Sequence, residues 1–376
     1  MEVSIGGCYQ TKYRGLDKER SLTDLVFECS KGLLDKYGLK RDEVDQVIIA
    51  ADDLLDGRSI SSMVTAAPAG GLLKEFMKVA GDGAFAFAYG CLGIEAGLSD
   101  LTMVVGWSKV LEVPFHCVTN LTFEPFYLRP FFDETTSKAV QAQKYVAQFN
   151  ITPDQAALVS VKNRSNACKN SNAHLRSEVG VEEVLSSELV SSPIRSLTNS
   201  VLSEGACAVL VASEKRSRAF KKPARVRGIG WDTDSYHMGD RDLSELTSLE
   251  KASTTAYAMA GIEDPVDEID VAEISDISAF HELMEYEALG FCDRGAGGKF
   301  MEDGHTRLGG KLPVNPSGGL ISSNPGCAAG LSRIAEAYLQ VSGDAGEHQI
   351  DHVNTSLAHG IQGNACQANC VVLLSK

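Results

Sequence analysis

The chain has 376 residues, of which 44% are hydrophobic and 23% charged, as in globular proteins and unlike disordered or fibrous ones. Its 35 Lys and Arg against 50 Asp and Glu give a formal charge of −15, which repels polyanions and argues against nucleic acid as a partner. The length exceeds one typical domain, so the chain has room for two similar halves.

A helix and a buried strand open the first half. Apolar residues at helical spacing predict a helix over residues 22–37, and the run from Val44 to Ala50 predicts a buried strand. Gly81-Asp82-Gly83 then precedes a small-residue helix over 84–97 and a strand over 101–105. A helix that leads into a buried strand is the pattern of α/β proteins.

Residues 110–200 interrupt this pattern with an insertion. It holds an aromatic, proline-rich segment from Pro114 to Phe132, a helix predicted over 136–149 and a polar stretch from Lys162 to Arg176. Long insertions of this kind form lids or substrate loops. The aromatic side chains either line a pocket or pack in the core: Phe115, Phe123, Phe126, Tyr127, Phe131 and Phe132.

The second half repeats the order of the first. A helix over 252–260 leads into the strand Ile269 to Ile274, and Ser323-Asn324-Pro325-Gly326 precedes a helix over 328–340. The sequence therefore predicts a duplicated α/β protein with halves 1–222 and 223–376. Each half places a helix N-terminus after a glycine-rich turn, where free N–H groups favour an anion or a thiolate, unless both are ordinary capped core helices.

Two blocks of the second half carry a family resemblance. The segments Ile274–Gly290 and Gly309–Gly319 resemble the thiolase superfamily, in particular the branch related to sterol carrier protein X thiolase. The segments Val105–Lys109, Glu204–Ala206 and His359-Gly360 agree with it as well. The resemblance covers essentially the whole chain and implies a five-layered αβαβα thiolase fold made of two βαβαβαββ halves.

The resemblance also implies a substrate and partners. It implies an enzyme that acts on coenzyme A thioesters, a homodimer formed through the first half, and a complex with a small zinc-ribbon/OB-fold protein. One such pairing is the thiolase that releases benzoyl-CoA in anaerobic toluene breakdown. We expect no metal in this chain, because Cys366 and Cys370 have no companion His or Cys pair at zinc spacing.

Three departures from the family decide the expected chemistry. The family carries a nucleophilic cysteine at the first glycine-rich turn, where the helix dipole lowers its pKa. Counting back from Gly97 and Asp100 puts this position at Ala80, so no covalent acyl-enzyme can form there. The family's histidine before the Asp of the second block is Ser275, and the histidine that helps form an oxyanion hole is Asn324.

The remaining site residues are assigned by motif position. We expect Asp276 to act as base, His359 as proton shuttle and Asn324 as oxyanion donor, while Cys327 or Cys366 could replace the lost thiol. A lone His is otherwise a structural residue, and an unpaired Cys is commonly core. Five residues of the glycine-rich segments are expected to contact the coenzyme A thioester: Asp82, Gly83, Asn315, Gly318 and Gly319.

Three functions follow from these residues. The first is thiolytic acyl transfer without the usual Cys, in which CoA thiolate attacks a β-keto thioester directly. The second is retro-aldol cleavage, which needs only a base and enolate stabilisation. The third is a non-catalytic scaffold or CoA-binding subunit of a thiolase complex, favoured by the lost catalytic positions. The catalytic class is preferred, by analogy with the fold.

The cysteines and the N-terminus indicate the compartment. Ten cysteines show no pairing pattern, and MEVSIGGCYQ has no basic region followed by an apolar stretch. The apolar runs are interrupted by Gly or charge and are shorter than the ~20 residues that cross a bilayer. We therefore expect a cytoplasmic protein with no membrane partner.

Overall fold

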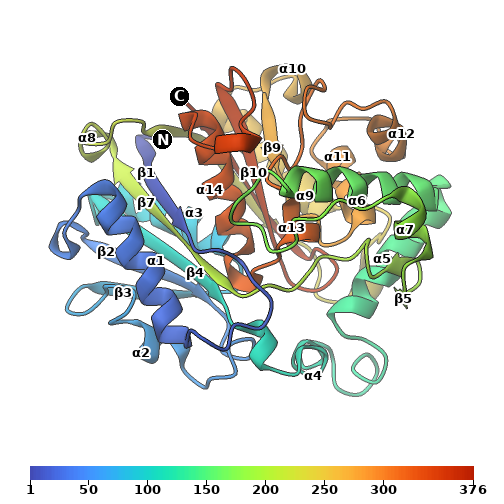
Figure 1. Cartoon of the computed structure of the whole chain (residues 1–376), viewed down its shortest axis with the longest axis horizontal. Helices are drawn as coiled ribbons and strands as arrows, with labels where there is room; N and C mark the ends of the chain where they lie inside the picture. The colour runs from blue at the N-terminus through green and yellow to red at the C-terminus, as the bar shows by residue number, and fades with distance from the viewer.

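A computed structural model describes residues 1–376, and its centre is one nine-stranded sheet in the order β3-β2-β4-β7-β1-β8-β11-β10-β9 (Figure 1). The half-sheets meet where β1 pairs with β8, at only Ser4–Arg225 and Ile5–Ala224. The strands are β1 (Val3–Gln10), β2 (Gln46–Ala51), β3 (Glu75–Ala80), β4 (Leu101–Ser108), β7 (Gly205–Ser213), β8 (Ala224–Thr233), β9 (Val271–Glu273), β10 (Thr355–Gln362) and β11 (Ala368–Ser375).

The duplication predicted from the sequence is visible in the strand neighbours. Strand β2 lies between β3 and β4 and runs parallel to both. Strand β9 runs parallel to β10 and forms a parallel bridge to Val314 through Ala272. The two predicted strands, 44–50 and 269–274, therefore occupy equivalent positions in the two half-sheets.

Five layers follow from how the helices cover these half-sheets. Helix α1 (Leu22–Tyr37) packs on the outer face of the first half-sheet. Helices α3 (Gly83–Glu95) and α14 (Ala329–Ser342) share a core with strands of both half-sheets, so they form the central layer. Helices α9 (Thr247–Ala260) and α11 (Ala279–Ala288) cover the outer face of the second.

Strand β2 shows why this layering suits the sequence. Val47 and Ile49 join the core beneath α1. Ile48 and Ala50 point the opposite way, into the core around α3 and α14. A strand covered on both faces reads as a continuous apolar run rather than an alternating one, which is the pattern over 44–50.

Helix α1 has the bounds that its apolar spacing predicts, because local signals mark both ends. Ser21 accepts a hydrogen bond from the N–H of Asp24, whose carboxylate accepts one from the N–H of Ser21. This reciprocal pair is a capping box. The helix ends at Gly38, whose φ of 66° is the left-handed conformation that glycine adopts without strain.

The insertion is mainly helical, and α4 with its following loop protrudes at the lower edge of the molecule (Figure 1). The polar stretch predicted from Lys162 begins inside a helix, where Lys162 and Asn163 are buried. The elements of the insertion are α4 (Phe115–Asn120), α5 (Glu134–Phe149), α6 (Pro153–Ala167), α7 (Val181–Ser186), β5 (Leu189–Ser191) and β6 (Ile194–Arg195).

Short helices complete the fold. None of the helices is long and apolar enough to span a bilayer. The short α-helices are α2 (Ser61–Thr65), α8 (Glu214–Ser217), α10 (Pro265–Glu268), α12 (Gly297–Glu302) and α13 (Gly319–Ser322). The 3-10 turns are η1 (Arg41–Glu43), η2 (Val110–Glu112), η3 (Met238–Asp240), η4 (Gly326–Ala328) and η5 (Gly346–His348).

Candidate active site

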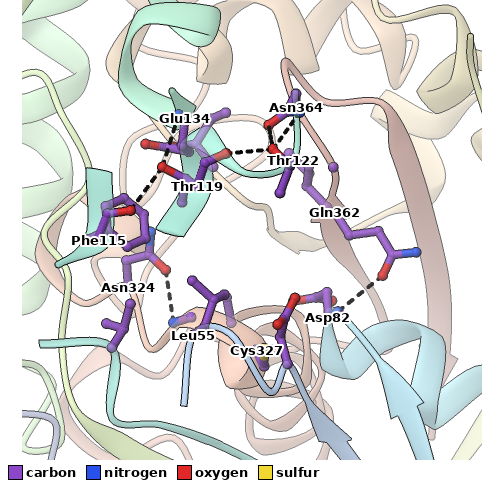
Figure 2. A pocket seen from close by; sticks show the side chains of 18 of the residues that line it. Leu55, Asp82, Phe115, Thr119, Thr122, Glu134, Asn324, Cys327, Gln362 and Asn364 are labelled. Carbon is purple, nitrogen blue, oxygen red and sulfur yellow. Dashed lines mark hydrogen bonds between the residues drawn. The ribbon is translucent and has the colours of Figure 1, made fainter. Parts of the chain in front are cut away.

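A cavity of about 290 Å³ lies where the N-termini of α3 and α14 meet the insertion. Figure 2 shows Asp82 and Cys327 on one side of it, with Thr119 and Glu134 on the opposite side. Helix α4 and the turn after it contribute side chains at helical spacing: Phe115, Val118, Thr119 and Thr122. The cavity therefore joins the central layer to the insertion.

Asp82 ties the two central helices together. It caps α3, and its Oδ1 accepts the N–H of Ala84 at 2.9 Å. Its Oδ2 accepts the N–H of Gly330, at the start of α14, at 2.7 Å. The side chain is buried, and this desolvation raises the pKa of the carboxyl to about 7 against the lowering effect of the N–H groups.

Asn324 presents a fixed amide to the same cavity. Its Nδ2 donates to Oγ of Ser200 at 3.0 Å, and its Oδ1 accepts the N–H of Gly326 at 3.2 Å. A carboxamide has two N–H donors, so one remains for a ligand. Asn324 therefore has an N–H group that is free to donate to an anion in the cavity.

An ion pair on α5 completes the wall, and sequence reasoning missed it. Lys138 Nζ donates to Oε1 of Glu134 at 2.7 Å and to Oε2 at 3.0 Å, and both residues line the cavity. The signal was present, because the two residues stand four apart directly after Asp133, which caps this helix. Glu134 and Lys138 reach the wall because of how α5 packs, and no local sequence pattern predicts that packing.

Asp276 lies behind the cavity wall, and not in it as expected for a base. Its carboxylate accepts the N–H groups of Leu320 and Ile321 at the start of α13 and a hydrogen bond from Asn163. Burial and the nearby Glu282 raise its pKa to about 8. In this position the Asp276 carboxylate satisfies free N–H groups at the start of α13.

Most of the residues that were expected to contact coenzyme A also lie outside the cavity wall. Asn315 is buried, accepts the N–H of Ile274 and donates to Glu282. Gly318 and Gly319 form the left-handed turn into α13, with φ of 102° and 63°. Gly83 packs against α14, where a Cβ would lie 2.5 Å from Leu331 Cβ. Of this group only Asp82 lines the cavity.

His359 is buried behind Ser275, on the side away from the cavity. Ser275 lines the cavity, and its Oγ donates to the backbone carbonyl of His359 at 2.7 Å. The His359 ring bonds to Oδ1 of Asn369 at 2.9 Å, and burial lowers its pKa to about 4, so the imidazole is neutral. His359 does not line the cavity, so the structure does not bring it opposite Asn324 as expected.

The aromatic segment, for which both pocket lining and core packing were open, contributes few of its aromatic side chains to the cavity. Phe115 alone of its aromatic residues lines the cavity. Phe123 and Phe132 stack on each other, with centroids 5.8 Å apart. Phe126 and Tyr127 project outward and are 82% and 80% exposed.

Known proteins resemble the chain over its full length. Residues 230–376 match the family described as "Thiolase C-terminal domain-like". An acetyl-CoA acetyltransferase of Methanothermobacter thermautotrophicus is 28% identical over 374 residues, 96% of each chain. The benzoylsuccinyl-CoA thiolase subunit BbsB of Thauera aromatica is 32% identical over 62% of this chain and 61% of its own.

A further relative and a solved structure are also similar to the chain. Bovine sterol carrier protein 2 is 28% identical over 71% of this chain and 52% of its own. The solved structure titled "Ltp2-ChsH2(DUF35) aldolase" superposes with a TM-score of 0.85 and 22% identity, covering 100% of this chain and 98% of that one. These similarities relate the chain to the thiolase superfamily. The matches to sterol carrier protein 2 and BbsB agree with the branch that the motifs indicated.

The cavity of this chain has no reactive thiol. Ala80 ends β3, directly before the Gly81-Asp82 turn. Cys327 lies in the wall beside Asp82, and burial raises its pKa well above the ordinary value. Cys366 is buried outside the wall, and burial raises its pKa as well. Both are therefore neutral thiols at pH 7, whereas the thiolate is the nucleophile.

No group of three or more His, Cys, Asp or Glu side chains is arranged to hold a metal ion. The polar residues that line the cavity are instead carboxyl, amide and hydroxyl residues and the Lys138–Glu134 pair. The carboxyl residues outside that pair are Asp52 and Asp82, and the amide residues are Asn324, Gln362 and Asn364. Such groups can transfer a proton and stabilise a developing negative charge.

Proposed function

We propose that the chain breaks or forms a carbon–carbon bond next to a coenzyme A thioester without a covalent acyl-enzyme. The observation that carries this is a thiolase-fold cavity that holds a fixed amide donor, Asn324, but whose thiol, Cys327, is neutral. A thioester enolate needs a donor at its oxygen, and an Asn donor of this type contributes roughly 3 kcal/mol. It needs no acyl-cysteine.

Retro-aldol cleavage of a β-hydroxyacyl-CoA, or the reverse aldol addition, suits these residues best. In this reaction the bond between Cα and Cβ breaks, its electron pair forms the enolate, and a ketone or aldehyde leaves. The reaction requires no external nucleophile, so the missing cysteine is no obstacle. The aldolase named among the structural neighbours supports this choice at the level of the fold.

Thiolytic acyl transfer is the second candidate. The relatives named as an acetyl-CoA acetyltransferase and a benzoylsuccinyl-CoA thiolase subunit favour it. Free CoA would then attack the β-keto group directly. The products distinguish the two reactions, because thiolysis consumes CoA and gives two thioesters, whereas retro-aldol cleavage gives one thioester and a carbonyl compound.

We also propose that the chain forms a homodimer and works with a small zinc-ribbon/OB-fold partner in the cytoplasm. Support comes from the name of the structural neighbour, which joins an aldolase to a DUF35 protein, and from BbsB, which is named as a subunit. Affinity purification from the native source at low salt, followed by mass spectrometry, should recover this partner. Recovery of the bare chain alone would refute the pairing.

The function is tested with a panel of β-hydroxyacyl-CoA and β-ketoacyl-CoA compounds and the native complex. Chromatography should show a new thioester and a carbonyl product, and intact-mass spectra of the chain should show no acyl adduct. Asn324→Ala should lower turnover ~10²-fold or more through the lost donor.

The control variant is Asn354→Ala, which removes an exposed amide that bonds only to His352. An acyl adduct on Cys327 would contradict the mechanism. Absence of turnover across the panel would favour the scaffold alternative.

A further inference from the structure

Asp82 is the buried carboxylate of the cavity that has no cationic partner. Its hydrogen bonds come from backbone N–H groups, those of Ala84 and Gly330. Glu134, on the opposite wall, is held by Lys138. Asp52, the third acidic residue of the lining, is only half-buried. The turn that carries Asp82 directly follows Ala80, the last residue of β3.

The second half of the chain leaves room for this carboxylate. A Cβ on Gly330 would lie 2.0 Å from Oδ1 of Asp82, and one on Gly360 would lie 2.5 Å from the same atom. Both distances are far shorter than van der Waals contact, so a side chain at either glycine would displace the carboxylate. Glycines of α14 and β10 thus shape the space around a side chain of the first half.

We propose that Asp82 is the general base and general acid of the carbon–carbon cleavage, an inference that rests on the proposed function. The Asp82 carboxylate takes the proton of the β-hydroxyl as the bond between Cα and Cβ breaks. The electron pair of that bond forms the enolate, whose oxygen accepts a hydrogen bond from Asn324. The carboxylic acid then returns the proton to Cα, so the products are an acyl-CoA and a ketone or aldehyde.

The surroundings of Asp82 allow both protonation states near neutrality. The N–H groups at two helix N-termini favour the carboxylate, and burial favours the acid. Their balance raises the pKa to about 7. The titratable side chains that face Asp82 are the thiols of Cys327 and Cys370, whose pKa values are raised by burial and which carry no charge at this pH. A general base works best with a pKa near the operating pH.

The test uses the half-reaction at Cα, which needs no knowledge of the acyl group. The native complex is incubated with acetyl-CoA and, separately, propionyl-CoA in deuterated buffer, and mass spectrometry follows deuterium at Cα. The wild-type protein should exchange these protons at a rate that rises through a midpoint near 7. Asp82→Asn should lower the rate by ~10²- to 10⁴-fold, the usual loss for a general base.

Two further variants separate catalysis from folding. Asp82→Ser keeps a good helix cap but has no base, so it should also lose exchange. Asp264→Asn removes an aspartate that caps α10 by accepting the N–H groups of Val266 and Asp267, and it should exchange normally. Thermal melting monitors the fold of each variant.

The outcomes distinguish the two proposals. If wild type exchanges and both folded Asp82 variants match its rate and midpoint, Asp82 is not the base, although the proposed function survives. If wild type neither exchanges Cα protons nor cleaves any thioester of the panel, the proposed function itself fails, and the role of Asp82 fails with it.

Discussion

Asp82 and Asp276 show how two similar carboxylates receive different roles. Each is buried, accepts two backbone N–H groups at the start of a helix and has a raised pKa. Only Asp82 lines the cavity. Both carboxylates bind the N-terminus of a helix. The difference between them is that only Asp82 is placed to contact a molecule in the cavity.

The raised pKa of Asp82 predicts a pH dependence of stability. The folded state binds this proton more tightly than the unfolded state, so the stabilisation is complete below about pH 4 and is lost as pH rises through about 7. The slope is at most ~1.4 kcal/mol per pH unit. Urea unfolding of wild type and Asp82→Asn from pH 5 to 8 should show the variant gaining relative stability with pH. Parallel curves would contradict this.

The neutral thiol of Cys327 predicts slow alkylation. Burial and a raised pKa both reduce its reaction with iodoacetamide at pH 7.5, because the thiolate is the reactive form. Cys117 is exposed and serves as an internal control in the same sample. Peptide mapping over time should show Cys117 labelled first. Equal rates would mean that Cys327 is activated, and would revive it as a nucleophile.

Helices α3 and α14 meet so closely that glycine is required on both. Gly83 faces Leu331, and Gly330 faces the Asp82 carboxylate. Both helices have free N–H groups at this end, and one carboxylate satisfies a donor of each. The contact between the N-termini of α3 and α14 thus forms one wall of the cavity, called the floor below.

Gly330→Ala should therefore displace Asp82. Overpacking of this kind costs about 1–3 kcal/mol, and the displaced carboxylate should lower Cα exchange more than the stability loss explains. Gly239→Ala is the control, since a Cβ there meets nothing within 4 Å. Urea unfolding and exchange are measured on both. A fully active, stable Gly330→Ala protein would show that the floor adapts.

The elements and the site differ in how far the sequence predicts them. Helix 22–37 and the strand over 44–50 were predictable because their periodicity and caps are local. The motifs named Asp82, Asn324 and Cys327, which line the cavity, but they did not name Glu134, because α5 reaches the wall only through packing. His359 lies in a motif, but β10 turns its ring away from the cavity toward Asn369.

A buried ion pair joins three parts of the first half. Lys109 Nζ lies 2.7 Å from Oε2 of Glu204, both side chains are fully buried, and the same Nζ donates to the carbonyl of Asp17. The pair connects the end of β4, the start of β7 and the N-terminal segment. Lys109 and Glu204 both belong to segments that carried the family resemblance. These two segments therefore serve to hold the fold together.

Breaking this pair should destabilise the whole protein. Lys109→Met leaves Glu204 buried without its partner, which costs about 3–5 kcal/mol. Lys109→Met combined with Glu204→Met should be more stable than the single variant. Lys31→Met, which breaks an exposed pair with Asp35, should cost under ~1 kcal/mol. Urea unfolding measures all three. A loss for Lys109→Met as small as that for Lys31→Met would contradict this prediction.

The bond from Asp82 to Gly330 crosses from one half of the chain to the other. If the halves moved apart, water would reach this carboxylate, and its affinity for a proton would fall. By thermodynamic reciprocity, a proton on Asp82 must hold the halves together more tightly, and so must any bound molecule that favours the protonated form. Protonation of Asp82 and the association of the two halves are therefore thermodynamically linked.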